Sequence, residues 1–223
     1  MSSIQRLFAM IVAISLFSIC LGIPCAQSEE NTGFAQELDS LREYFAETVE
    51  PTPEPVMTVP DTQEGMTAYS LGGFIYFIWD DWVEVGHDDN PQGSVVARSY
   101  SRDPEDEDKT DCLIMVVDTS LRKDGTTPED IIGDFVLGLM MAAFDENGQQ
   151  AQTLVEWSRI RGIEGVLITE EARLSAWITG IGSKAIMVAF SGSTLSMTEM
   201  RHMLLEMLGV TEDEIETRSL DTF

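Results

Sequence analysis

One strongly patterned helix separates two groups of strand-like segments in this chain. Its start, Thr126-Thr127-Pro128-Glu129-Asp130, combines a threonine cap, a proline in the first turn and two carboxylates at the positive end of the helix. Apolar residues then recur at helical spacing from Ile131 to Phe144, and Asn147-Gly148 ends the pattern. Strands joined by short turns pair mostly antiparallel, and such a sheet needs helices over its apolar faces. The order therefore predicts an α+β fold, a mainly antiparallel sheet covered by two or three helices.

The segments on either side of this helix have the composition of strands. Ahead of it, strands are predicted at residues 74–79, 95–100 and 113–117, with a further extended segment at 82–85 and loops at 86–93 and 103–108. Behind it, strands are predicted at residues 153–159, 165–170, 175–179 and 185–190, separated by Gly162, residues 171–172 and residues 180–184. A capping box at Ser196-Met197-Thr198-Glu199 opens a last helix that Gly209 closes.

The N-terminal residues 1–28 have the form of a signal peptide. Arg6 precedes the uncharged residues 7–23, and the small residues Ala26 and Ser28 place a cleavage site directly after Ser28. A retained membrane anchor needs about 20 apolar residues, so this segment lies at the short end of that range. We therefore predict an exported protein, periplasmic or secreted, with a form anchored in the membrane by this segment as the alternative.

The cysteines that remain in the mature chain depend on whether the N-terminal segment is cleaved. Cys20 and Cys25 lie in the N-terminal segment, and neither follows the small residue that a lipidated cysteine requires, which makes lipidation a third, less supported alternative. Cleavage leaves Cys112 alone, so no disulfide can form within the mature chain. Because Cys112 precedes an apolar run, we expect it in or near the core.

The mature chain divides into three parts. Residues 29–65 combine a short amphipathic helix at 34–47 with a proline-rich linker. Residues 66–209 form one predicted α+β domain of ordinary size. Residues 210–223 form an acidic tail that is expected to fray.

The charge of the chain excludes several kinds of partner. Its formal net charge is −26 at pH 7, and loss of the signal, whose one charged residue is Arg6, leaves −27. Such a surface repels phosphates and anionic lipid headgroups. We therefore expect no nucleic-acid binding, and no peripheral membrane binding unless the N-terminal segment is retained.

Two segments resemble motifs of the PsbP-like fold. Gly73-Phe74-Ile75-Tyr76-Phe77-Ile78-Trp79-Asp80-Asp81-Trp82 is similar to the opening signature of that family, with Trp79 where the family has proline. Ile160-Arg161-Gly162-Ile163-Glu164-Gly165 resembles its later paired-glycine strand. The family includes the extrinsic oxygen-evolving protein of photosystem II, a Ran-binding factor and many exported bacterial proteins. Over residues 66–209, the resemblance implies an α/β/α sandwich and a scaffold that mostly binds partners.

Familiar catalytic and cofactor motifs do not account for any segment. Gly180-Ile181-Gly182-Ser183-Lys184-Ala185 fits G-x-G-x-x-G/A, but a strand is predicted after it where dinucleotide binding requires a helix, so we interpret it as a hairpin turn. The sequence contains no G-x-S-x-G elbow and no Walker A loop. Its two histidines, His87 and His202, have no identifiable nucleophile, and His202 is expected on a helix surface. We predict no catalytic residue and no organic cofactor.

Two clusters are candidate metal sites. His87-Asp88-Asp89 offers an imidazole and carboxylates to a transition metal, although consecutive side chains diverge. The acidic loop with Asp106 and Asp108 offers oxygens to Ca²⁺, although it lacks the EF-hand spacing. The alternatives are a solvated turn and a charged loop that protects a strand edge.

These features favour an exported, non-catalytic binding or accessory protein of the cell envelope, with an unidentified protein or envelope component as its partner. Trp79, Trp82 and Trp157 are candidate anchors for that partner, with burial in the core as the alternative for at least two of them.

The competing function is a metal-dependent or hydrolytic envelope enzyme. It requires a pocket that gathers His87 with Asp88, or with Arg159 or Arg161.

Overall fold

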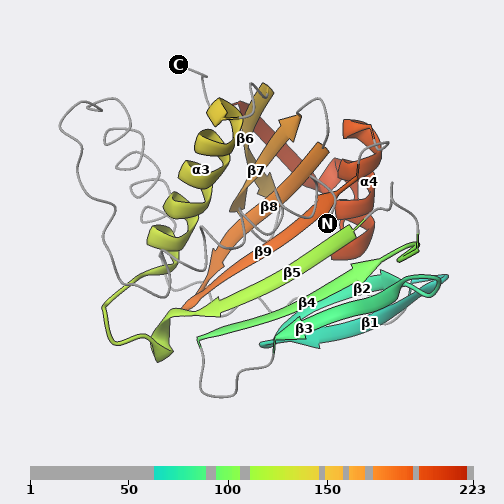
Figure 1. Cartoon of the computed structure of the whole chain (residues 1–223), viewed down its shortest axis with the longest axis horizontal. Helices are drawn as coiled ribbons and strands as arrows, with labels where there is room; N and C mark the ends of the chain where they lie inside the picture. Colours follow the sequence, from blue (N-terminus) through green and yellow to red (C-terminus); the bar gives the residue numbers. More distant parts are fainter. Residues whose placement is uncertain are drawn as a thin grey trace.

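The computed structural model describes residues 63–88, 94–105, 111–145, 149–157, 161–168, 173–192 and 196–219 (Figure 1). The predicted signal, the helix at 34–47 and the proline-rich linker up to residue 62 lie outside these ranges. The described chain forms a two-stranded hairpin, an eight-stranded antiparallel sheet and two α-helices. The predicted α+β class and mainly antiparallel sheet are confirmed. Within the described ranges, no helix is both long enough and apolar enough to cross a membrane.

The hairpin consists of β1 (Met66–Leu71) and β2 (Phe74–Trp79). The large sheet has the strand order β10-β6-β7-β8-β9-β5-β4-β3. Its strands are β3 (Val83–Asp88), β4 (Val95–Ser101), β5 (Asp111–Asp118), β6 (Gln149–Trp157), β7 (Arg161–Ile168), β8 (Arg173–Ile181), β9 (Lys184–Ser191) and β10 (Ile215–Ser219). The helices are α3 (Pro128–Asp145) and α4 (Met197–Leu208), and the short 3-10 turns are η1 (Thr119–Leu121) and η2 (Glu212–Glu214).

The sheet buries apolar side chains on both faces, as β5 shows. Odd-numbered residues of β5 such as Met115 join a core with α3, which packs across β6 to β9 (Figure 1). Even-numbered residues such as Ile114 join a second core with the β1–β2 hairpin and α4. Because both faces are covered, β5 is a continuous apolar run without alternation. The expected burial of Cys112 is confirmed, and this burial raises the pKa of its thiol.

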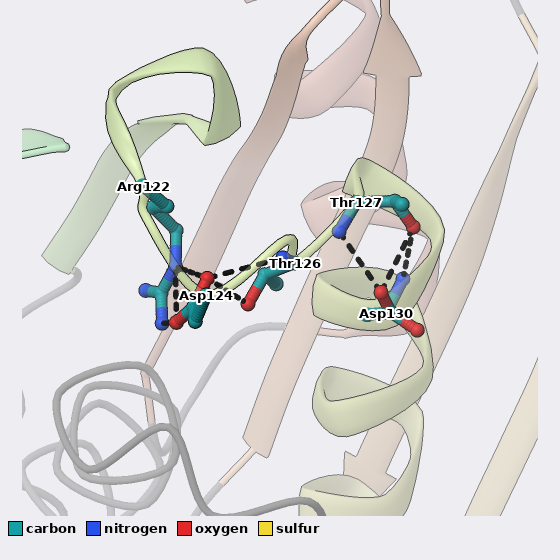
Figure 2. Close-up of polar contacts among 5 residues, drawn as sticks. All are labelled: Arg122, Asp124, Thr126, Thr127 and Asp130. Atoms are coloured by element: carbon teal, nitrogen blue, oxygen red, sulfur yellow. Dashed lines mark hydrogen bonds and ion pairs between the residues drawn. The ribbon is translucent and has the colours of Figure 1, made fainter.

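Both helices begin at the predicted caps. The Thr127 N–H donates to Oδ2 of Asp130 at 2.9 Å, and the Asp130 N–H donates to Oγ1 of Thr127 at 3.3 Å (Figure 2). Ser196 and Glu199 form the capping box of α4, and Gly209 ends that helix with a φ of 62°. These predictions hold because capping depends on hydrogen bonds within a single turn.

The hairpin interpretation of residues 180–185 is also confirmed. Ile181 pairs with Lys184 across the turn, and Gly182 has a φ of 59°. Since β9 follows directly, no helix N-terminus is available there to hold a pyrophosphate.

The predicted loop at 86–93 is wrong at its start, because β3 continues to Asp88 and pairs with β4. The strand lies at the edge of the sheet, where polar residues are tolerated. A bulge between Glu84 and Gly86 also shifts the register, so residues 86–88 do not continue the alternation of residues 83–85. The exposed strand β1 is likewise absent from the sequence-based prediction, since its side chains are mostly in solvent.

Two further predictions are wrong for non-local reasons. Gly162 lies inside β7 and does not separate two strands. The tail predicted to fray from residue 210 contains η2 and β10, and β10 pairs with β6 from Ile215 to Ser219. Neither the place of Gly162 inside β7 nor the pairing of β10 with β6 can be recognised from the neighbouring residues in the chain.

Candidate functional site

Trp79 and Trp82 lie together where the hairpin passes into the large sheet. The Trp82 N–H donates to the Trp79 carbonyl at 3.0 Å, which places the two indole centroids 5.2 Å apart. Both rings pack on Phe190, at centroid distances of 6.3 and 6.2 Å. Each indole is half-buried, so the pair belongs to the core on one side and to the surface on the other. The side chain of Trp157, the third candidate anchor, lies outside what the structure describes.

The edge strand β3 follows directly and is exposed along its length apart from the half-buried Gly86. Val83 and Val85 are 50% and 47% exposed. Exposed apolar side chains on an edge strand favour contact with another chain, because such an edge also offers backbone hydrogen-bonding groups. We call Trp79, Trp82, Val83 and Val85 the β3 surface.

A short polar chain crosses from β3 to β4. Oε1 of Glu84 lies 3.1 Å from Nδ1 of His87, and Oε2 of Glu84 lies 3.8 Å from Nε of Arg98. Arg98 also donates to the carbonyl of Ala97 at 3.0 Å. One exposed carboxylate is therefore shared by the imidazole and the guanidinium at this edge.

Three tyrosines lie beside this polar chain. The hydroxyls of Tyr76 and Tyr100 are 2.9 Å apart and buried, and the ring of Tyr69 stands 5.9 Å from each of the other two rings. Burial raises the pKa of Tyr76, and burial raises the pKa of Tyr100 as well. Both hydroxyls therefore stay protonated at neutral pH and act as a packed support for β4.

The predicted metal cluster His87-Asp88-Asp89 is only partly described. His87 is paired with Arg98 and Asp88 with Ala97, so the two side chains project to opposite faces of the sheet. Asp89 lies outside the described residues. Among the residues that are described, no three His, Cys, Asp or Glu side chains gather closely enough to hold a metal ion. The register therefore does not bring His87 and Asp88 together.

The predicted calcium loop is described at its start alone. Oδ1 of Asp103 accepts a hydrogen bond from the Glu105 N–H at 3.2 Å. Asp106 and Asp108 lie outside the described residues, so calcium binding at this loop stays a prediction.

A second set of polar contacts lies in the segment between β5 and α3 (Figure 2). Nε of Arg122 lies 3.2 Å from both carboxylate oxygens of Asp124. Oδ1 of Asp124 also accepts from the N–H and the hydroxyl of Thr126, at 3.0 and 2.6 Å. The Arg122 guanidinium and the Thr126 hydrogen bonds hold the pKa of Asp124 well below its usual range. Because its partners belong to the same loop, we assign this carboxylate a role in shaping the connection to α3.

Sequence reasoning found the tryptophans but missed the valines and the Glu84–Arg98 pair. The alternation Val83-Glu84-Val85 after Trp82 was the available signal, and it is typical of a strand with one face in solvent. That β3 is an edge strand follows from the strand order, which a local pattern does not contain.

Comparison with known proteins gives matches among solved structures alone. No family model matches the sequence, and no curated protein matches it. The solution structure of cyanobacterial PsbP from Synechocystis matches with a TM-score of 0.44 and 12% identity, over 70% of this chain and 95% of that one. It has the fold that the sequence resembles. A protein of unknown function from Pseudomonas aeruginosa matches with a TM-score of 0.30 and 11% identity, over 61% of this chain and 87% of that one. Because these TM-scores and identities are low, the binding partner of the β3 surface has to be inferred from the residues of this chain.

Proposed function

We propose that the protein is an exported, non-catalytic binding or accessory protein of the cell envelope, and that its partner docks on the β3 surface. The observation that carries this proposal is the exposure of Val83 and Val85 on an edge strand, beside the half-buried Trp79–Trp82 pair. Covering a valine side chain contributes about 1 kcal/mol of favourable free energy, and a partly exposed tryptophan offers a larger area for the same purpose.

The location of the protein is part of the same proposal. Cleavage after residue 28 releases a periplasmic or secreted domain, whereas retention of that segment tethers the domain to a membrane through the linker. The proposed architecture is an α/β/α sandwich of the PsbP-like kind. One helical layer is α3, and α4 shares the other layer with the β1–β2 hairpin.

One separation and one difference in side-chain direction favour binding over the metal-dependent or hydrolytic enzyme. Strand β7, which begins at Arg161, is separated from β3 by four strands. At roughly 4.8 Å per strand spacing, His87 and Arg161 are about 24 Å apart along the sheet. His87 and Asp88 also project to opposite faces. Among the described residues, neither Asp88 nor Arg161 is therefore assembled with His87, and Arg159 lies outside the described ranges.

Affinity capture from the native envelope, followed by mass spectrometry, tests the proposed function. The bait is the protein itself, compared with a variant in which Val83→Ser and Val85→Ser remove the apolar side chains without adding charge. The matched control is Leu121→Ser, which truncates an exposed apolar residue in η1.

We expect a specific partner that the double serine variant loses and the Leu121→Ser variant keeps. Since these side chains are exposed, the variants should fold with a stability within about 0.5 kcal/mol of the parent, which thermal unfolding checks. Equal recovery by the parent and the double variant would show that the partner binds elsewhere.

A further inference from the structure

Strand β3 ends the eight-stranded sheet, and no described strand lies beyond it (Figure 1). A strand in this position presents alternate backbone N–H and C=O groups away from its one neighbour, here β4. Such an edge can pair with an extended segment of another chain, with backbone hydrogen bonds giving affinity and side chains giving selectivity.

The charge around this edge selects among possible segments. Asp80, Asp81, Glu84 and Asp88 are exposed beside or within β3. Two arginines offset part of this charge: Arg98, mostly buried and 3.8 Å from Glu84, and the exposed Arg102, which follows the β4 residue paired with Val83. The four carboxylates outnumber them. The edge is thus acidic, in keeping with a chain whose net charge is −26.

A second copy of this chain fits the edge poorly. Two β3 strands side by side would bring the same carboxylates together, which is electrostatically unfavourable. A cationic segment reverses the electrostatic contribution from repulsive to attractive.

We infer that β3 accepts an extended, lysine- or arginine-rich segment of a partner protein as a ninth strand of the sheet. This inference rests on the proposed function and specifies the chemistry of the partner. The backbone of β3 hydrogen-bonds the segment, Val83 and Val85 contact its apolar side chains, and the surrounding carboxylates meet its cations.

The test uses two synthetic peptides, acetyl-Lys-Val-Lys-Val-Lys-Val-Lys-amide and its counterpart with glutamate in place of lysine. Amide hydrogen exchange is followed by NMR on the protein as isolated, with and without each peptide. We expect the lysine peptide to slow exchange in β3 about tenfold, while β10 at the other edge is unchanged. Because the attraction is between exposed charges, its affinity should fall about tenfold between 50 and 500 mM salt. The glutamate peptide should slow no amide.

A matched pair of variants locates the effect. Val85→Lys places a like charge and a long side chain against the lysine peptide and should weaken binding about tenfold. Leu121→Lys adds the same charge at an exposed position in η1 and should change the affinity less than twofold.

Three outcomes overturn the inference: no slowing in β3 with the lysine peptide, equal slowing in β10, or a concentration-dependent dimer that protects β3 without peptide. The capture experiment separates this result from the proposed function. If the double serine variant loses its envelope partner and the lysine peptide protects nothing, the binding function stands and strand addition fails. If the variant keeps its partner, the docking surface itself is misassigned.

Discussion

Gly162 in β7 lies directly against the buried indole of Trp177 in β8. A β-carbon built at Gly162 would stand 2.3 Å from Nε1 of Trp177 and 2.9 Å from the carbonyl oxygen of Ile178. Trp177 is among the largest fully buried side chains, and Ile178 contributes main chain, so neither can move aside cheaply. The residue at 162 is therefore limited to glycine by a neighbour fifteen positions away in the chain.

We expect Gly162→Ala to destabilise the protein by about 1–3 kcal/mol, the usual cost of overpacking a core. Urea unfolding measures this. The control is Gly86→Ala in β3, where the nearest atom to an added β-carbon is 3.8 Å away and the change should stay below about 0.5 kcal/mol. Equal losses for the two variants would contradict the packing argument.

A second prediction concerns Glu164, which is nearly buried and accepts a hydrogen bond from Arg201 in α4 at 2.7 Å. Burial raises the pKa of Glu164 above 4.5, and the Arg201 charge opposes this in part. The folded state then binds the proton more tightly than the unfolded state. The stability from this group is present below pH 4.5 and is lost as the pH rises through the raised pKa.

Glu164→Gln removes this titration. The difference in unfolding free energy, parent minus variant, should decrease as the pH rises above 4.5, measured by urea unfolding from pH 4 to pH 8. Glu212→Gln, an exposed position in η2, should give a difference that varies by less than about 0.5 kcal/mol. A parent-minus-variant difference that increases with pH would mean that Arg201 outweighs burial.

The hydroxyl pair of Tyr76 and Tyr100 gives a third prediction. The two hydroxyls are buried and lie 2.9 Å apart. Tyr76→Phe or Tyr100→Phe therefore leaves the remaining buried hydroxyl without this hydrogen bond. Each single change should cost about 1–2 kcal/mol, and the double change less than their sum. A double-mutant cycle by chemical unfolding checks this, and strictly additive losses would show that the two hydroxyls are independent.

The fourth prediction concerns the attachment of the β1–β2 hairpin. Nζ of Lys184, at the start of β9, donates to the Gly72 carbonyl in the hairpin turn at 2.6 Å. Lys184→Met should speed amide exchange in β2 about fivefold while β8 keeps its rate, because a charged hydrogen bond of about 1 kcal/mol is lost at one end of the hairpin. Lys123→Met, at an exposed lysine of the β5–α3 connection, is the control and should leave both strands unchanged.

Much of the fold was predictable from short segments. The strand at residues 74–79, the start of α3 and both ends of α4 lie where the sequence places them, since their signals act within one turn or one strand. The candidate site was predictable in part. Trp79 and Trp82 were recognised as residue types, but the exposure of Val83 and Val85 depends on which strand ends the sheet.

What the sequence by itself determined is the class of the fold and the nature of its local elements, such as the helix cap at Ser196–Glu199 and the hairpin turn at Gly182, together with a net charge of −26. The tertiary structure alone decided that β3 is an edge, that β10 completes the other side, and that position 162 must be glycine. The physical reason is distance along the chain. Ile215 pairs with Trp157, and Trp177 occupies the space beside Gly162, so the decisive partners are brought together by the assembled sheet.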